Sequence, residues 1–355
     1  LKPDVLAGLL GKLNPEGLGE MLAKLTPEGL LEFLRGLSPD LLADTLNKLK
    51  PSDLADTLKQ LVPDGVAEVL GKLSPGDLGD VLTTLEPDAL GEILTTLSPD
   101  ALAQTLEILS PDDLGEVLKS LSSEDLGEVL TALSQDALAR TLGRLSSKDL
   151  GDILTNLSQE DLGEVLTALS PEALTQILIM LSSEDLGEVL TSLSSEDLGY
   201  VLIKLPPAAL GQVLSTLSPE DLGKVLTNLQ SGDLGKVLTS LPPMTLAQIL
   251  SKLSASDLGY VLTELSPEDL SLTLNKLSQA SLASTLGNLE YQDLVSVLEK
   301  LPLSNREQIL QSLSLAEQVK LLTRLGPTQR SRLFPNVTEE EYSQMLTSLT
   351  AEELA

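Results

Sequence analysis

The chain has 355 residues, and its 53 acidic against 23 basic side chains give a formal net charge of −30, with no cysteine and no histidine. Disulfide bonds, thiolate metal sites and histidine-based catalysis are therefore excluded, and so acidic a surface predicts no nucleic-acid partner. Aromatic residues make up only 2% of the chain. Because a large globular core normally uses aromatic side chains to fill volume, this small residue alphabet indicates a repeat protein.

A leucine recurs every twelve residues from Leu1 to Leu325, and Val337 and Leu349 continue the row. No insertion or deletion interrupts the period. A fixed period of this kind is the mark of repeat architectures, in which each unit needs its neighbours to bury an apolar face.

The unit at residues 121–132 shows how one repeat is built. Leu126, Val129, Leu130 and Leu133 stand at i, i+3, i+4 and i+7, which is one face of an α-helix. Ser122 is the expected N-cap, and an acid three residues later predicts a shortened capping box. Each unit is then one helix of about ten residues, too short to be stable alone. The sequence therefore predicts an all-α solenoid, a superhelix of about thirty single-helix repeats.

A second period of 36 residues lies inside the first. The residue before the second leucine is usually Asp, but every third unit replaces it with a small residue; these replacements are Ala101, Ala137, Ala173, Ala209, Thr245 and Ser281. The repeats are thus grouped in three-helix units of 36 residues. One explanation is duplication of a three-helix ancestor, and the other is that three helices complete one superhelical turn. We favour the geometric explanation, although both can hold.

Residues 1–300 are predicted to be the regular solenoid. From Leu301 onward the second leucine is replaced by Arg306, Gln318, Arg330 and Tyr342, and basic residues become common. Solenoids need atypical end repeats to cover the last apolar face, so residues 301–355 are predicted to be degenerate, more basic capping repeats of the same solenoid. Because the chain starts at Leu1 and both ends fall inside the pattern, we expect a fragment of a longer protein.

Glycines follow the repeat and fall in mid-helix, where Gly costs about 1 kcal/mol relative to Ala. So regular a cost predicts close helix–helix approach at positions where a Cβ would clash, with mechanical compliance as the alternative. The packing glycines singled out are Gly79, Gly127, Gly163, Gly187 and Gly223.

No catalytic, cofactor or metal motif is found. Paired acids such as Glu124 and Asp125 fall in the first turn of a helix, where capping explains them better than weak calcium binding along an acidic stripe. Two sequons make Asn156 and Asn336 possible N-glycosylation sites, as in an extracellular glycoprotein. No apolar run approaches the ~18 residues of a membrane span, so we expect no span in this segment.

The run Leu-Ser-Pro-Glu-Asp-Leu, at residues 217–222 and 265–270, resembles the short-helix repeats of the mesothelin, stereocilin and otoancorin family. That resemblance implies a superhelical extracellular protein linked to cell surfaces or apical matrices. The chain is also similar to the cytosolic N-domain of bacterial magnesium transporters, a superhelix of short helices with fewer repeats than this chain. Neither family supplies catalytic residues.

The leading functional hypothesis is a non-enzymatic structural or adhesive rod at the cell surface or outside the cell. It would self-associate head-to-tail into filaments or a matrix, or bind matrix and cell-surface proteins in cell adhesion. The alternative is an intracellular α-solenoid scaffold that binds a protein or peptide in its groove. Binding solenoids usually vary their groove residues, whereas the non-core positions of this chain change little, which favours lattice building.

Overall fold

The computed structural model describes residue 10 and residues 12–349, which form short α-helices joined by tight turns and include no β-strand. Two compact units divide the chain, residues 1–185 and residues 186–355. The predicted all-α repeat solenoid is confirmed within each unit.

The helices of the first unit are α2 (Pro15–Leu22), α3 (Pro27–Arg35), α4 (Pro39–Asn47), α5 (Pro51–Lys59), α6 (Pro63–Leu70), α7 (Pro75–Thr84), α8 (Pro87–Thr96), α9 (Pro99–Ile108), α10 (Pro111–Ser120), α11 (Ser123–Thr131), α12 (Gln135–Gly143), α13 (Ser147–Asn156), α14 (Gln159–Ala168) and α15 (Pro171–Met180). The division between the units falls within α16 (Ser183–Ser192).

The helices of the second unit are α17 (Ser195–Lys204), α18 (Pro207–Thr216), α19 (Pro219–Asn228), α20 (Ser231–Ser240), α21 (Pro243–Lys252), α22 (Ala255–Glu264), α23 (Pro267–Lys276), α24 (Gln279–Asn288), α25 (Tyr291–Lys300), α26 (Leu303–Ser312), α27 (Leu315–Leu333) and α28 (Glu339–Ser348).

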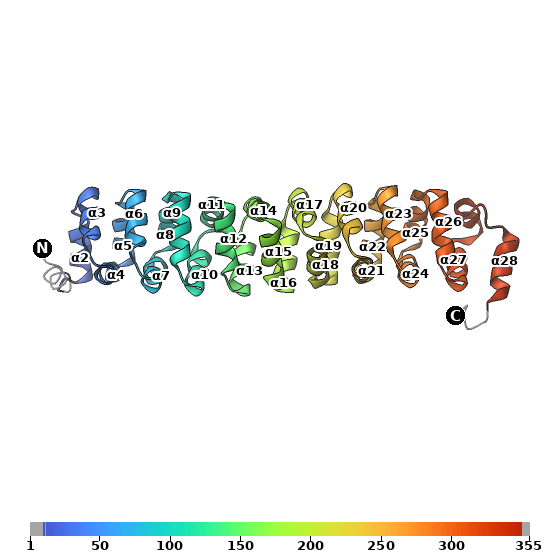
Figure 1. Ribbon diagram of the computed structural model, residues 1–355, viewed down its shortest axis with the longest axis horizontal. Helices are drawn as coiled ribbons and strands as arrows, with labels where there is room; N and C mark the ends of the chain where they lie inside the picture. The colour runs from blue at the N-terminus through green and yellow to red at the C-terminus, as the bar shows by residue number, and fades with distance from the viewer. Residues whose placement is uncertain (1–9, 11, 350–355) are drawn as a thin grey trace. The chain divides into compact units, whose positions relative to one another are not determined.

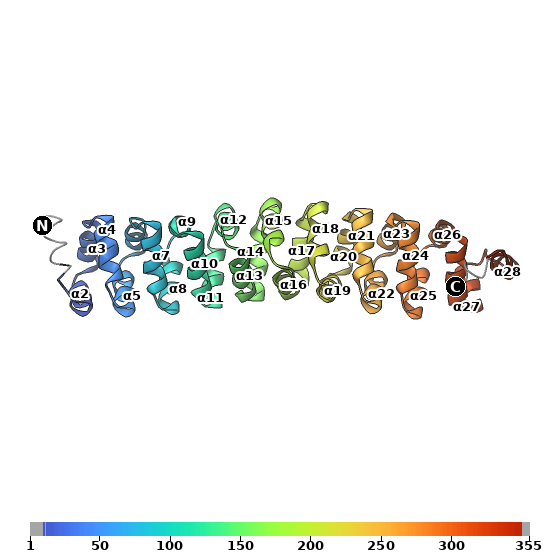
Figure 2. The same cartoon turned by 90° about the horizontal axis from the view of Figure 1, so that it is seen from below.

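Within each unit, the regular helices pack on the helices three places away in the chain. In the first unit α10 lies between α7 and α13, and in the second unit α22 lies between α19 and α25. Figure 1 shows α3, α6 and α9 side by side along one edge of the first unit, and Figure 2 shows α22 and α25 in the same relation in the second. Three helices therefore make one solenoid turn, which confirms the geometric explanation of the 36-residue period.

The periodic leucines and valines form the core of each unit. In α11, the side chains of Leu126, Val129 and Leu130 are fully buried, and the leucines of the flanking turns, Leu121 and Leu133, are nearly so. The same repeat positions are buried in the other regular helices. A helix of eight to ten residues is thus held by the turns above and below it, as expected for a solenoid.

Helix starts differ from the prediction in one detail. The Ser122 hydroxyl accepts the backbone N–H of Asp125 at 3.1 Å, as expected of an N-cap, and donates to the Asp125 carboxylate at 2.7 Å. The Asp125 carboxylate therefore accepts a hydrogen bond from the Ser122 hydroxyl and not from the backbone N–H of the cap residue. Glu has one more methylene and reaches back, so at Ser314 and Glu317 both bonds of a capping box are present.

Glycine and aspartate pack together between turns. A Cβ built on Gly79 would lie 2.5 Å from Cγ of Asp113, and one built on Gly187 would lie 2.7 Å from the carboxylate of Asp221. Each Asp stands 34 residues after its Gly, on the helix one turn further along. The inverse pair also occurs, because Leu31 fills the space at Gly65. The regular Gly-Asp pattern is therefore a matched fit of small and large residues across neighbouring turns.

Carbonyl groups at helix ends find donors from the following turn. The Arg144 guanidinium donates to the carbonyls of Leu106 and Glu107 at 3.1 and 3.2 Å. Lys276 donates to Leu241 at 3.2 Å in the same way. A cation at a helix C-terminus satisfies orphan carbonyls and complements the helix dipole, so these basic residues hold successive turns together.

The C-terminal helices depart from the pattern where the sequence does. Helix α27 joins two repeat helices across Gly326, whose φ of 72° and ψ of 169° are not helical. Arg330, which replaces a core leucine, is only 4% exposed, pairs with Glu339 at 2.8 Å and stacks on the ring of Tyr342 at 3.7 Å. These contacts fasten α28 to α27. Whether 301–355 acts as a cap stays a prediction.

Candidate functional site

The helices α18, α21, α24 and α27 of the second unit pack on one another in that order and form one row. They belong to the three-helix register in which Asp is replaced, here by Ala209, Thr245 and Ser281. In this row the residue that faces the preceding turn is therefore not an Asp. Gly211 approaches Thr245 as closely as other glycines approach Asp, with 2.8 Å between a built Cβ and Cγ2.

At three outward positions of each repeat this row carries no carboxylate. Counting the periodic leucine as position 1, residues at positions 4, 8 and 11 point away from the core. We call these residues the neutral face: Ala208, Gln212, Ser215, Met244, Gln248, Ser251, Ala280, Ser284, Gly287, Ala316, Lys320 and Thr323. All of them are exposed or half-exposed.

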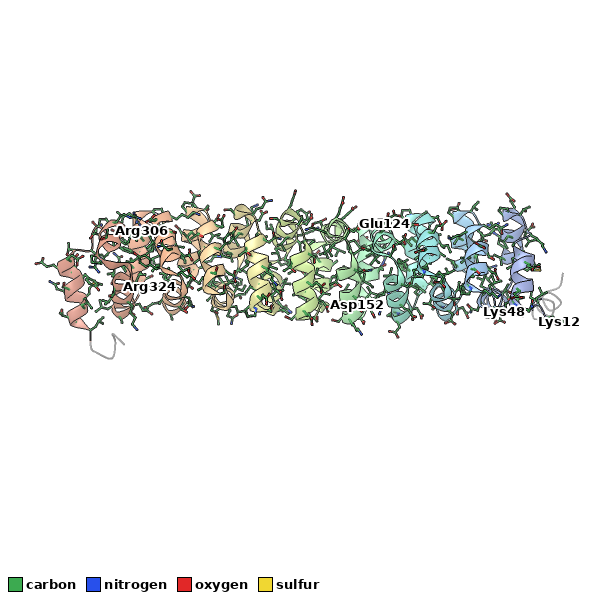
Figure 3. All side chains as sticks on the ribbon, turned by 180° about the vertical axis from the view of Figure 1, so that it is seen from behind. Lys12, Lys48, Glu124, Asp152, Arg306 and Arg324 are labelled. Atoms are coloured by element: carbon green, nitrogen blue, oxygen red, sulfur yellow. The ribbon has the colours of Figure 1, made fainter. Side chains whose placement is uncertain are left out.

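Neighbouring rows of the second unit carry acids at the same positions: Glu196, Glu220, Glu268 and Glu299. The first unit is more acidic than the second: residues 1–185 hold 33 acidic and 12 basic residues, whereas residues 186–355 hold 20 acidic and 11 basic residues. Figure 3 shows side chains covering the outside of each unit, among them Glu124 and Asp152 of the first and Arg324 of the second. The neutral face is thus a local exception on a strongly acidic chain.

Two crevices open along the neutral face, one on each side of α24. The first lies between α21 and α24, has a volume of about 330 Å³, and is lined by small and amide side chains that include Ala247, Gln248, Ser284 and Asn288. Its lining offers the hydroxyl and amide groups of residues on both helices. Such groups suit hydrogen bonding to the backbone of an extended peptide.

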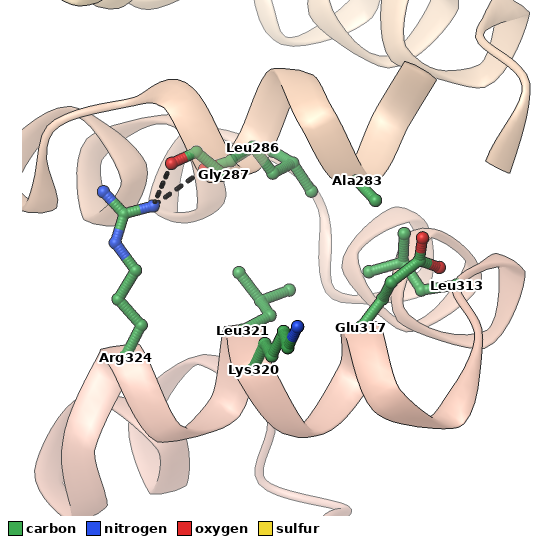
Figure 4. A pocket seen from close by; sticks show the side chains of 8 residues that line it. All are labelled: Ala283, Leu286, Gly287, Leu313, Glu317, Lys320, Leu321 and Arg324. Atoms are coloured by element: carbon green, nitrogen blue, oxygen red, sulfur yellow. Dashed lines mark hydrogen bonds between the residues drawn. The ribbon is translucent and has the colours of Figure 1, made fainter. Parts of the chain in front are cut away.

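The second crevice lies between α24 and α27 and has a volume of about 210 Å³ (Figure 4). The walls are apolar and are formed by Leu286, Leu313 and Leu321. On the α24 side, the crevice is open because Ala283 has a short side chain and Gly287 has none. A Cβ added to Gly287 would meet no atom within 4 Å, so the space at this residue is open. The crevice is small and largely apolar, with charged groups at its edges.

Three charged residues of α27 border this crevice. Burial opposes ionisation of Glu317, but hydrogen bonds from the Ser314 N–H and hydroxyl and from Gln279 outweigh it, so the pKa of Glu317 is lowered. Arg324 donates to the carbonyls of Leu286 and Gly287, both at 3.0 Å (Figure 4).

Lys320 is exposed, and its charge acts on the Glu317 carboxylate, whose pKa it helps to lower. With Glu317 ionised, the crevice edge still carries one net positive charge from Lys320 and Arg324. The edge is therefore a locally positive site on a chain of strongly negative charge.

Two further cavities lie at other places in the units. One of about 470 Å³ in the first unit is bordered by Leu18, Asp44 and Lys48. One of about 380 Å³ in the second unit is bordered by Phe334, Asn336 and Glu341. Neither cavity is lined by residues of the neutral face.

The residues singled out from sequence do not lie on the neutral face. Gly79, Gly127, Gly187 and Gly223 face Asp113, Asp161, Asp221 and Asp257 between turns, and Gly163 is buried in α14. Asn156 and Asn336 are exposed at the surface, where the Asn336 amide donates to Glu307, and their glycosylation stays a prediction.

Sequence reasoning missed the neutral face as a site. The available signal was the 36-residue row of Gln212 and Gln248, together with the loss of acids at position 4 (Ala208, Met244 and Ala280). Within the described residues, no group of three potential metal ligands is found, and no helix is long and apolar enough to cross a membrane.

A comparison of the sequence with curated proteins finds no match. Among solved structures, the chain is similar to the RNA-binding domain of yeast Puf5p bound to SMX2 RNA, with 13% identity, a TM-score of 0.36, and 97% of each chain covered. It is similar to the Puf3 RNA-binding domain bound to a Cox17 RNA site, with 11% identity, a TM-score of 0.28, and 97% of this chain and 99% of that chain covered. An engineered protein matches with 13% identity, a TM-score of 0.29, and 96% and 97% covered.

The expectation that nucleic-acid partners are excluded is wrong, because solved helical structures that resemble this chain over most of its length are RNA complexes. The physical reason is that net charge sums over the whole chain, whereas a binding surface is set locally, as the neutral face shows. At these TM-scores the similarity carries no argument for an RNA partner of this chain.

The sequence matches the family described as the MgtE intracellular N domain in five overlapping stretches, residues 49–141, 121–213, 193–293, 229–323 and 289–355. The overlap explains how a family domain with fewer repeats can account for so long an array. Of the two resemblances seen in the sequence, the one to the N-domain of magnesium transporters is thereby confirmed, and the one to mesothelin stays a prediction. The chain belongs to the family of the MgtE intracellular N domain.

Proposed function

We propose that this chain is a non-enzymatic, intracellular scaffold that binds an extended segment of a partner protein along the neutral face. The observation that carries the proposal is the absence of carboxylates from positions 4, 8 and 11 of α18, α21, α24 and α27, together with the two crevices beside α24. A concave or grooved helical row is the surface that solenoids use to hold extended partners.

The description of the family to which the chain belongs supports the intracellular placement that we propose. It favours the scaffold over the extracellular adhesive rod that the sequence suggested first. The change along the row fits the same choice, because position 8 is Gln in the first two helices, Gln212 and Gln248, and then becomes Ser284 and Lys320. Binding solenoids vary their groove residues in this way.

The test uses the full chain as bait for a displayed library of random twelve-residue peptides, with affinities of enriched peptides measured by fluorescence anisotropy. In one variant, Gln212→Glu, Gln248→Glu and Ser284→Glu add three negative charges to the neutral face. The first unit already carries Glu at this repeat position, as at Glu92 and Glu128, so the fold tolerates the change.

The matched control adds three negative charges at the same repeat position in other rows, by Tyr260→Glu, Leu272→Glu and Ser296→Glu. All three control residues are exposed. We expect the neutral-face variant to weaken peptide binding at least tenfold and the control to leave it unchanged. Absence of enriched peptides, equal loss in both variants, or binding of random RNA oligonucleotides in place of peptides would overturn the proposal.

A further inference from the structure

The crevice between α24 and α27 is the right size for one side chain. Its volume of about 210 Å³ is below the ~300–1,000 Å³ of sites that take drug-sized molecules. Leu286, Leu313 and Leu321 are each less than a tenth exposed and present apolar atoms to the space. An aliphatic side chain placed there would remove apolar surface from water on both partners.

The charge beside the crevice selects the partner residue next to that aliphatic side chain. Glu317 is occupied by its own helix cap and by Gln279, whose amide donates to it at 3.2 Å. Arg324 is occupied by the carbonyls of α24. Lys320 is exposed at this edge, and the carboxylate that senses its charge is that of Glu317, which the backbone N–H of Ser314 already binds.

We propose that this crevice is the anchor pocket of the binding face, and that it recognises an aliphatic residue adjacent to an acidic residue in an extended partner segment. The aliphatic side chain enters between α24 and α27, and the acidic side chain pairs with Lys320. The inference rests on the proposed function, because it names the partner chemistry of the same face. Charge complementarity to a positive edge on an acidic chain is the observation that commits it to an acidic partner residue.

The crevice can be filled without disturbing the fold. Gly287→Leu adds a side chain where a Cβ meets no neighbour, and Leu is a better helix former than Gly. Ala283→Leu is a second way to fill the space from the same helix. Circular dichroism melts of both variants confirm that each is folded before binding is measured.

The binding experiment uses synthetic fluorescein-labelled peptides built on the best displayed sequence, with its aliphatic residue changed to Ala or its acidic residue changed to Asn or Lys. We expect removal of the aliphatic group to weaken binding about 10-fold to 100-fold and loss of the acid about 2-fold to 5-fold. Gly287→Leu should reproduce the first loss. Lys320→Glu should reverse the preference, so that the peptide carrying Lys binds better than the peptide carrying the acid.

The two proposals fail in different ways. Peptides that bind the neutral face but respond neither to Gly287→Leu nor to Lys320→Glu would overturn the anchor pocket and leave the scaffold function standing. Displayed peptides without an aliphatic–acidic pair in common would do the same. Failure of every peptide to bind would overturn both.

Discussion

The pairing of Gly79 with Asp113 gives the sharpest test of how successive turns fit together. A Cβ at Gly79 would sit 2.5 Å from Cγ of Asp113, so Gly79→Ala must push the carboxylate away from its bond with Ser110. Overpacking of this kind costs about 1–3 kcal/mol, against a helix-propensity gain of about 0.5–1 kcal/mol. We therefore expect a net destabilisation of up to about 2 kcal/mol.

The second half of the test is Asp113→Ala, which removes the obstruction. Alone it loses a favourable first-turn acid, about 0.3–1 kcal/mol, and leaves a gap. The double variant recreates the Ala-Ala combination that the sequence already uses at Ala103 and Ala137. In it the propensity gain returns without the clash, so the double variant should be about as stable as the parent, with a coupling energy of about 1–2 kcal/mol.

The assay is native-state hydrogen exchange of amides in α7 and α10, because a long repeat array need not unfold in a single step. Exchange reports the local opening free energy of the two helices directly. If the two single changes add within about 0.5 kcal/mol, the residues are independent and the small-to-large fit between turns is refuted.

Three further predictions concern charged side chains. Arg330→Leu restores the usual core leucine and should leave the stability unchanged or raise it. Glu339→Ala leaves the buried guanidinium without its carboxylate partner and should lower the free energy that holds α28 in place by about 1–3 kcal/mol. Limited proteolysis at α28 measures both effects. The hydrogen bond from Lys119 lowers the pKa of Asp149 below its ordinary 3.8, so the stabilisation is present above that pH and lost as pH falls through the lowered value. The difference in melting temperature between the parent and Lys119→Met should therefore narrow as the pH falls through the lowered pKa of Asp149. A constant difference would contradict the link between this pKa and stability. Arg144→Met removes donors from the end of α9 and should lower stability by about 1–2 kcal/mol in urea unfolding; an unchanged midpoint would show that water replaces them.

Much of the local structure can be predicted from spacing alone. The apolar i, i+3, i+4 pattern and the Ser before most helices predict the regular helices and their first residues, because both signals act within one turn of the chain. The 36-residue period was also visible, as was the departure after Leu301. The spacing does not predict the hydrogen bond from the Ser hydroxyl to the Asp carboxylate at the helix starts, because the length of the Asp side chain decides which donor it reaches.

The sequence by itself determined the all-α repeat architecture, because a twelve-residue unit with one apolar face can bury that face only by stacking. Tertiary structure decided which units meet. Only the packing of each helix on the third one along pairs Gly79 with Asp113 and brings Ala283 opposite Leu321. The same packing gathers Gln212, Gln248 and Lys320 into one face, although 36 or more residues separate them in the chain. Proximity across turns depends on the number of helices per turn, a quantity set by side-chain packing and not by any local pattern.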